Sequence, residues 1–136
     1  MARYSQTPLV KKLGLRPGMR LQVIGDPLDY AALVDDLPDG LQWVGDKETG
    51  LDFIHLFTSN RAGLEEALPR QVPRLAKTGV LWISWPKKSS GLASDLDENI
   101  IRETGLKNGM VDVKVCAVNE QWSGLKFVFR LKDRHI

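Results

Sequence analysis

The chain of 136 residues contains a single cysteine, Cys116, so it cannot form a disulfide within itself. Cys-x-x-Cys pairs and Cys/His combinations with zinc-ligand spacing are also absent, and we therefore predict no metal site. No uncharged apolar run approaches the ~20 residues that a transmembrane helix needs. The opening MARYSQTPLVKK lacks the apolar segment of a secretory signal. These absences predict a cytoplasmic protein without a membrane partner.

Net charge is small but unevenly distributed. The chain has 19 basic and 17 acidic residues, and the net charge of +2 is too small to indicate a polyanionic partner. Residues 1–20 hold five basic side chains and no acid, whereas residues 35–52 hold six acids and one lysine. Basic residues do not alternate with several aromatics, as they would in a single-strand binding surface, which argues against nucleic acid. Attraction between the two charged segments instead predicts a weak homodimer.

Apolar patterning predicts six strands. Residues 51–57 (LDFIHLF) are almost continuously hydrophobic, which is typical of a strand buried on both faces. The last two strands are joined by NEQWS, which is too short for a crossover, so they must be antiparallel neighbours. The expected strands are 20–25, 41–45, 51–57, 80–85, 110–118 and 124–132.

Helices are predicted between these strands. The starts are expected at Asp26, where a proline follows, at Ser59 or Asn60, and at Asp95, where Glu98 completes a capping box. Prolines 69 and 73 should kink or divide the second of these helices. The expected helix ends are Gly79 and Gly105.

The order of these elements predicts an α/β fold in three layers. Its mostly parallel, twisted sheet has about six strands and ends in an antiparallel hairpin, all within a single domain at residues 1–136. Trp82 and Trp85 lie three apart on one strand and should face opposite sides. The last strand alternates between apolar and basic residues, so one sheet face near the hairpin should be thinly covered, open to water or to a partner.

Three segments resemble an uncharacterised bacterial protein family. They are YSQTPLVKKLGLRPGMRL near the start, LWISWPKKSSGLASDL in the middle and VDVKVCAVNEQWSGLKFVFR near the end. The resemblance covers nearly the whole chain, and it implies a small S-adenosylmethionine-dependent methyltransferase-like fold without an assigned activity. PGMRLQVIG is similar to the entry into the first strand of methyltransferases.

The chain departs from the methyltransferase pattern directly after this strand. Cofactor-binding methyltransferases carry an Asp/Glu-x-Gly-x-Gly loop there, whose glycines let the backbone approach the cofactor. This chain reads VIGDPLDY, in which Gly25 is the single glycine, and one βα unit between the second and third strands is missing. We therefore predict that the chain binds no cofactor. S-adenosylmethionine is the cofactor that a methyltransferase-like fold would bind.

Two functions are compatible with this pattern. The lost glycines favour a non-catalytic binding or regulatory module on a degenerate methyltransferase-like fold. The alternative is an S-adenosylmethionine-dependent methyltransferase that acts on an unknown acceptor. No catalytic residue is predicted, because Cys116 has no activating base nearby in the sequence and His55 is interpreted as a hydrogen-bonded core residue.

Ligands of open α/β sheets bind beyond the carboxyl ends of the strands. This rule selects four strand ends, namely Gly25-Asp26-Pro27, Gly45-Asp46, Thr58-Ser59-Asn60 and the segment from Trp85 to Ser90. The candidate cofactor-binding residues among them are Gly25, Asp26, Asp46 and Trp85. In methyltransferases an acid at the position of Asp46 often binds the ribose hydroxyls. Within GDKETG the same residue is also an ordinary turn aspartate, which is the interpretation that the sequence favours.

The loop after Trp85 holds the densest cluster of basic and hydroxyl side chains. We predict that Lys87, Lys88, Ser89 and Ser90 hold one small anionic ligand, with Trp122 as an aromatic neighbour. Alternatively, this is a solvated loop whose lysines balance nearby acids. The ligand is expected between this loop and the turn at Gly25-Asp26-Pro27, because the first and fourth strands are expected to lie side by side.

Overall fold

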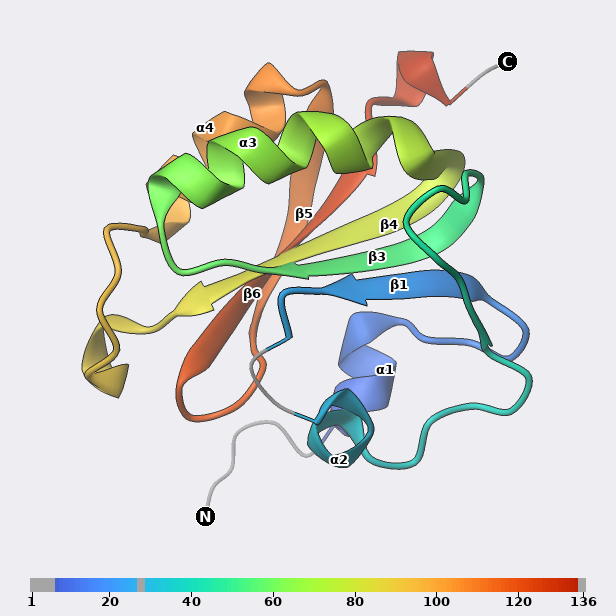
Figure 1. Ribbon diagram of the computed structural model, residues 1–136, viewed down its shortest axis with the longest axis horizontal. Coiled ribbons are helices and arrows are strands. Elements are labelled where there is room, and N and C mark those ends of the chain that lie inside the picture. Colours follow the sequence, from blue (N-terminus) through green and yellow to red (C-terminus); the bar gives the residue numbers. More distant parts are fainter. Residues whose placement is uncertain (1–6, 27–28, 135–136) are drawn as a thin grey trace.

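The computed structural model describes residues 7–26 and 29–134, which form one six-stranded sheet between two layers of helices (Figure 1). The strand order is β2-β1-β3-β4-β6-β5. The first four strands in this order are parallel, and β6 and β5 are antiparallel to their neighbours. The predicted mostly parallel sheet with a terminal hairpin is confirmed. The strands are β1 (Arg20–Ile24), β2 (Gln42–Trp43), β3 (Leu51–Phe57), β4 (Leu75–Pro86), β5 (Met110–Ala117) and β6 (Trp122–Phe129).

Helices cover both faces of the sheet. Figure 1 shows α1 (Leu9–Leu13) and α2 (Tyr30–Val34) on one side, and α3 (Arg61–Gln71) and α4 (Glu98–Lys107) on the other. Trp82 belongs to the apolar cluster under α1 and α2, and Trp85 to the cluster under α3 and α4, as the strand alternation predicts. The central strand β3 is buried on both faces, because all but one of its side chains are buried.

Two predicted helix starts are wrong by two or three residues. α2 is capped by Asp29, whose carboxylate accepts from the N–H groups of Ala31 and Ala32, and not by Asp26. Pro27, which suggested the earlier start, lies outside the described residues. α4 is capped by Asp97, because the Asp95 carboxylate instead accepts from the backbone N–H of Arg61 at the start of α3, 2.8 Å away. Local sequence cannot reveal that competing tertiary partner.

The predicted boundary between α3 and β4 also moves. Pro69 lies inside α3, and Pro73 lies in a 3₁₀ turn (Val72–Arg74) that leads directly into β4. Residues 77–79, expected to end the helix, therefore belong to β4. The strand is longer than the predicted 80–85 because its first residue, Leu75, pairs with Leu51, and a register shift separates this pair from the next one, Phe53 with Val80.

The connection from β2 to β3 is short. Residues 44–50 contain no helix or strand, which agrees with the βα unit expected to be missing. The buried guanidinium of Arg74 holds this loop by donating to the carbonyl oxygens of Gly45 and Glu48 at 2.7 and 2.9 Å. β2 is at the sheet edge and pairs only with the first residues of β1, Arg20 and Leu21. The loop therefore leaves the sheet before the carboxyl end of β1.

The terminal hairpin has one well covered and one less covered side. Leu125, Phe127 and Phe129 of β6 are buried under α4, whereas Lys126 and Val128 on the other side are half-buried. The thinly covered face predicted from the alternation is therefore present. The pattern does not extend to 131, because β6 ends at Phe129 and the following residues form a 3₁₀ turn.

Gly105 sits inside α4 rather than at its end, and it marks the closest approach of this helix to β6. A Cβ at this position would overlap the buried ring of Phe127. Helix propensity favours Gly105→Ala by about 1 kcal/mol, but relieving such an overlap costs about 1–3 kcal/mol. We expect Gly105→Ala to lower the free energy of unfolding, measured by urea denaturation. In a Phe127→Leu background the same change should become neutral or stabilising. Stabilisation by Gly105→Ala in the wild-type background would contradict this packing.

Candidate functional site

A pocket of about 460 Å³ opens at the carboxyl ends of the central strands. Gly25 follows β1, Phe57 and Thr58 end β3, and Pro86 ends β4. Trp122 closes one side from the start of β6, and the loop after β4 contributes Leu92 and Ala93. The pocket lies where the carboxyl-end rule places it, and its volume is in the range of small-molecule sites. We call it the edge pocket.

The strand order corrects one premise of the site prediction. β1 and β4 are not neighbours, because β3 lies between them and pairs with both. The chain runs from β1 outward to β2 and returns to β3 on the other side of β1, so the winding reverses between β1 and β3. The middle of the edge pocket is therefore the end of β3, with Ser59 and Asn60 in its lining. The carboxyl-end rule selects both residues from the sequence, where they are also candidate helix caps.

Gly25 is required by the protein backbone itself. It has φ +71°, and a Cβ there would lie 2.5 Å from the carbonyl oxygen of Phe57. In a cofactor-binding glycine loop the missing Cβ leaves space for the ligand, whereas here a neighbouring strand fills that space. Asp26, the next residue, is half-buried and is one cause of the raised pKa of the Tyr30 phenol, after burial.

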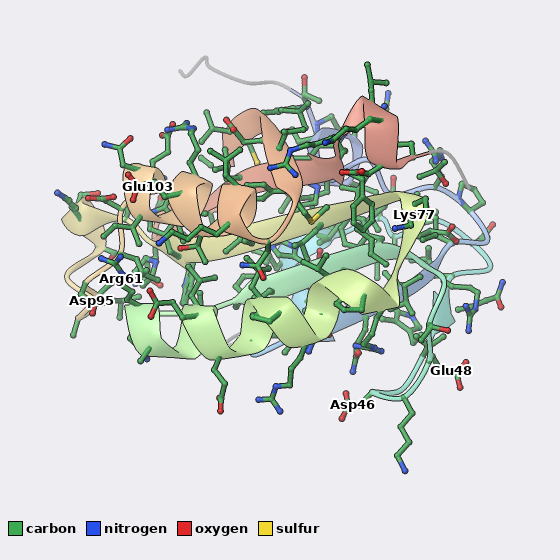
Figure 2. All side chains as sticks on the ribbon, turned by 90° about the horizontal axis from the view of Figure 1, so that it is seen from above. Asp46, Glu48, Arg61, Lys77, Asp95 and Glu103 are labelled. Atoms are coloured by element: carbon green, nitrogen blue, oxygen red, sulfur yellow. The ribbon has the colours of Figure 1, made fainter. Side chains whose placement is uncertain are left out.

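Asp46 does not reach the edge pocket. Its carboxylate accepts from Nε2 of Gln22 at 2.5 Å, and it lines a separate cavity of about 450 Å³ beside Arg70 on α3. Figure 2 shows Asp46 near one end of α3, and Arg61 and Asp95 at the other. Because Trp43, the last residue of β2, pairs with Leu21, the chain leaves the sheet well before the carboxyl edge.

The two candidate tryptophans have different surroundings. Trp85 is buried in the cluster under α3 and α4 and lines none of the cavities described for this part of the chain. Trp122 lines the edge pocket and meets the ring of Phe57 edge-to-face at 5.5 Å between centroids. Its backbone N–H donates to Oδ1 of Asn119, which fixes the hairpin turn behind it. Trp122 is therefore the one of the two that a ligand in the edge pocket could touch.

The predicted anion loop is divided by the structure. Residues Lys88–Ser90 form a 3₁₀ turn, in which Ser90 Oγ accepts from the N–H of Leu92 at 3.0 Å. Lys88 and Ser89 are exposed and line none of the cavities found in the described residues. Lys87 lines a different cavity, on the side of β5. The four residues do not surround one site.

The loop from Gly91 to Asp97 forms the outer wall of the edge pocket. Asp95 anchors it to α3, and Figure 2 shows Asp95 and Arg61 close together at the start of that helix. Asn60 caps the same helix by accepting from the N–H of Gly63 at 2.7 Å, as predicted. The first turn of α3 is therefore occupied by the protein's own oxygen atoms.

A buried polar network lies behind the pocket. The Nδ1 atom of His55 is 2.7 Å from the Tyr30 hydroxyl, and its Nε2 atom is 2.7 Å from Ser84 Oγ. Burial lowers the pKa of His55 to about 3, so the ring is neutral, and all three side chains are buried. His55 is thus a hydrogen-bonded core residue, as the sequence predicts, and not a base that a ligand could reach.

The described residues contain no group of three or more His, Cys, Asp or Glu side chains that could hold a metal ion. Among the helices of these same residues, none is long and apolar enough to cross a membrane.

Comparison with known proteins identifies the fold but no family. No protein-family model and no curated protein matches the chain, so the bacterial family above stays a resemblance. A SAM-dependent methyltransferase from Aquifex aeolicus matches with a TM-score of 0.62 and 14% identity, over 88% of this chain and 86% of that one. The chain has a methyltransferase-like fold.

Two further structures support this assignment. The magnesium protoporphyrin IX methyltransferase from Synechocystis with bound SAH matches with a TM-score of 0.58 and 11% identity, over 90% of this chain and 78% of that one. The M1A22 tRNA methyltransferase TrmK from B. subtilis matches with a TM-score of 0.57 and 14% identity, over 96% of this chain and 68% of that one. At such identities the likeness shows the fold alone, and the named activities belong to those proteins.

S-adenosylmethionine fits the lining of the edge pocket poorly. Gly25 faces a carbonyl of the protein, and Asp46 lies elsewhere. None of the lining residues, all of which are within the described residues, carries a charge, although the amino-acid end of the cofactor has both an ammonium and a carboxylate. Among the described residues that line the edge pocket, none offers a charged partner for either end group of such a cofactor.

The neutral His55 makes stability depend on pH. Its pKa in the folded state, about 3, is below the usual 6.5, so the unfolded state binds the proton more readily. Stability is then fully present above pH 6.5 and falls as the pH drops toward 3. We expect a loss of about 2 kcal/mol between about pH 7.5 and pH 5, measured by urea denaturation at each pH.

Most carboxylates titrate below this window, so a His55→Gln variant isolates the effect. It should be less stable than the wild type at neutral pH, and its stability should change little between about pH 7.5 and pH 5. An equal slope in the wild type and the variant would show that His55 is not the titrating group.

Proposed function

We propose that the protein is a non-catalytic binding module whose edge pocket takes a small, uncharged, planar ligand of the nucleoside type. The observation that carries this proposal is the composition of the lining. Phe57, Trp122 and Leu92 provide apolar surface, while Ser59 and Asn60 provide hydrogen-bonding groups at the same opening. A flat heterocycle with polar edges matches that combination.

The absence of catalysis rests on the same lining. Proton transfer needs a titratable side chain within hydrogen-bond reach of the reacting atom. None of the residues that line the edge pocket, which all belong to the described part of the chain, is Asp, Glu, His, Cys, Lys or Tyr. The nearby His55 is buried and already bonded on both nitrogens. The pocket can bind and orient a ligand, and it offers no acid or base to act on it.

The second candidate is an S-adenosylmethionine-dependent methyltransferase. The structural comparisons favour it over the binding module, because the matching structures reported above carry methyltransferase names, one of them with bound SAH. The residues of the edge pocket favour the binding module. The two candidates differ in whether the charged amino-acid end of the cofactor contributes to binding.

A thermal-shift series separates the candidates. A ligand at about 100 times its dissociation constant stabilises the folded state by about 2.7 kcal/mol, which raises the melting temperature by several degrees. For the binding module we expect adenosine to give such a shift, and S-adenosylmethionine and its demethylated product to give no larger one. A much larger shift with either charged compound would favour the methyltransferase. If none of the three compounds raises the melting temperature, adenosine-type compounds are excluded as ligands of the edge pocket.

A substitution that fills the pocket localises the effect. Ser59 lines the edge pocket and is exposed, and Ser89 is an exposed serine outside it. We expect Ser59→Trp to abolish the shift with adenosine and Ser89→Trp to keep it. Equal loss in both variants would place the binding elsewhere.

A further inference from the structure

A second cavity lies away from the edge pocket. It has a volume of about 690 Å³ and is bordered by Thr7, by Lys12 of α1, by Lys87 directly after β4, and by Lys114, Val115, Cys116 and Ala117 of β5. It shares no lining residue with the edge pocket. Three separate segments of the chain each bring one lysine to it. We call it the lysine pocket.

These lysines have no carboxylate partner among the described residues. None of the salt bridges within the described residues includes Lys12, Lys87 or Lys114. Lys114 also lies directly opposite Lys126 on β6, and like charges in that arrangement destabilise a sheet. Burial lowers the pKa of Lys126, and the neighbouring Lys114 and Arg16 lower it further. The fold thus keeps a repulsive cluster on its thinly covered face.

Cys116 lines the same pocket as the three lysines. Burial raises the pKa of its half-buried thiol, and the nearby ammonium groups of Lys12 and Lys114 lower it. These two lysines come from different elements, α1 and β5, and both lie near this thiol. Val115 and Ala117 alternate with Lys114 and Cys116 along β5, so their exposed side chains point to the opposite face of the sheet.

From this arrangement we infer that the lysine pocket binds a small phosphate monoester, with the phosphate among Lys12, Lys87 and Lys114. A phosphate monoester carries a charge of about −1.5 to −2 at pH 7 and three acceptor oxygens, so each lysine can meet one oxygen. A single carboxylate has too little charge to balance three ammonium groups. The site is independent of the ligand proposed for the edge pocket.

The single cysteine of the chain makes this site directly measurable. Alkylation of Cys116 by iodoacetamide, an uncharged reagent, reports occupancy of the pocket floor. With phenyl phosphate at about ten times its dissociation constant, alkylation should slow about tenfold, because reaction then proceeds through the free fraction. Benzyl alcohol, which is uncharged and of similar shape, should not protect. Failure of phenyl phosphate to protect Cys116 would overturn the proposal.

Matched pairs of lysines provide the control. Lys12→Ala with Lys87→Ala removes two charges from the pocket, whereas Lys11→Ala with Lys88→Ala removes two exposed charges from the adjacent positions, which do not line it. Such lysines contribute little to stability, so both variants should fold. We expect protection by phenyl phosphate to be lost in the first variant and kept in the second. Equal loss of protection in both variants would show that the phosphate is attracted by the overall positive charge, and it would overturn the proposed site.

Two other occupants are outcomes that contradict the proposal. Protection by a single-stranded oligonucleotide but not by phenyl phosphate would identify a nucleic-acid surface. Salt-sensitive self-association that disappears in the Lys12→Ala, Lys87→Ala variant, without protection by phenyl phosphate, would mean that the acidic segment 35–52 of a second copy occupies the pocket. Phenyl phosphate should still protect Cys116 in Ser59→Trp, so failure of either proposal leaves the other intact.

Discussion

The structure depends on how one polar side chain is accommodated in the middle of the most deeply buried strand. His55 lies on β3, between Phe53 and Phe57, and has no contact with water. Burying an imidazole without partners would cost several kcal/mol, so its two nitrogens must be satisfied. Tyr30 of α2 and Ser84 of β4 do this at 2.7 Å each. The network thereby joins a helix and two strands that the apolar contacts alone would hold less specifically.

The walls of the edge pocket follow from that network. The ring of His55 stacks on that of Phe57 at 4.3 Å, and Phe57 in turn meets Trp122 edge-to-face. The carbonyl of Phe57 leaves no room for a side chain at Gly25. A chain of direct contacts therefore runs from the core to both sides of the pocket. It explains how the crevice of a methyltransferase-like fold persists here while its glycine-rich loop does not.

A structural feature could be predicted from the sequence where residues close in the chain determine it, and not where distant residues do. Period-two alternation and the short NEQWS connection were sufficient for the hairpin, because neither depends on distant residues. The caps at Asp26 and Asp95 were wrong for the opposite reason, since Asp95 is bound by a helix that starts 34 residues earlier in the chain. Likewise, His55 was predicted to be hydrogen-bonded, but nothing near it in the sequence identifies Tyr30 or Ser84.

The position of the edge pocket follows from the sequence more readily than the residues that line it. Strand order alone puts Gly25 and Trp122 at the carboxyl edge, and both line the edge pocket. Lys87 and Lys88 are adjacent in sequence, yet Lys87 borders the lysine pocket while Lys88 begins the next turn. Asp46 was misplaced because β2 is only two residues long, a length that the LQWVG pattern does not specify.

Edge protection is the simplest structural reason for a lysine on β5, and it accounts for only part of the cluster. β5 is the last strand of the sheet, and natural edge strands carry lysines and bulges that prevent pairing with other chains. Lys114 and the register shift beside it, between Asp112 and Lys114, serve that purpose. Lys12 and Lys87 lie on other elements and protect no edge, yet they border the same cavity. Three ammonium groups that border one cavity repel one another, and an anion that enters the pocket would reduce this repulsion.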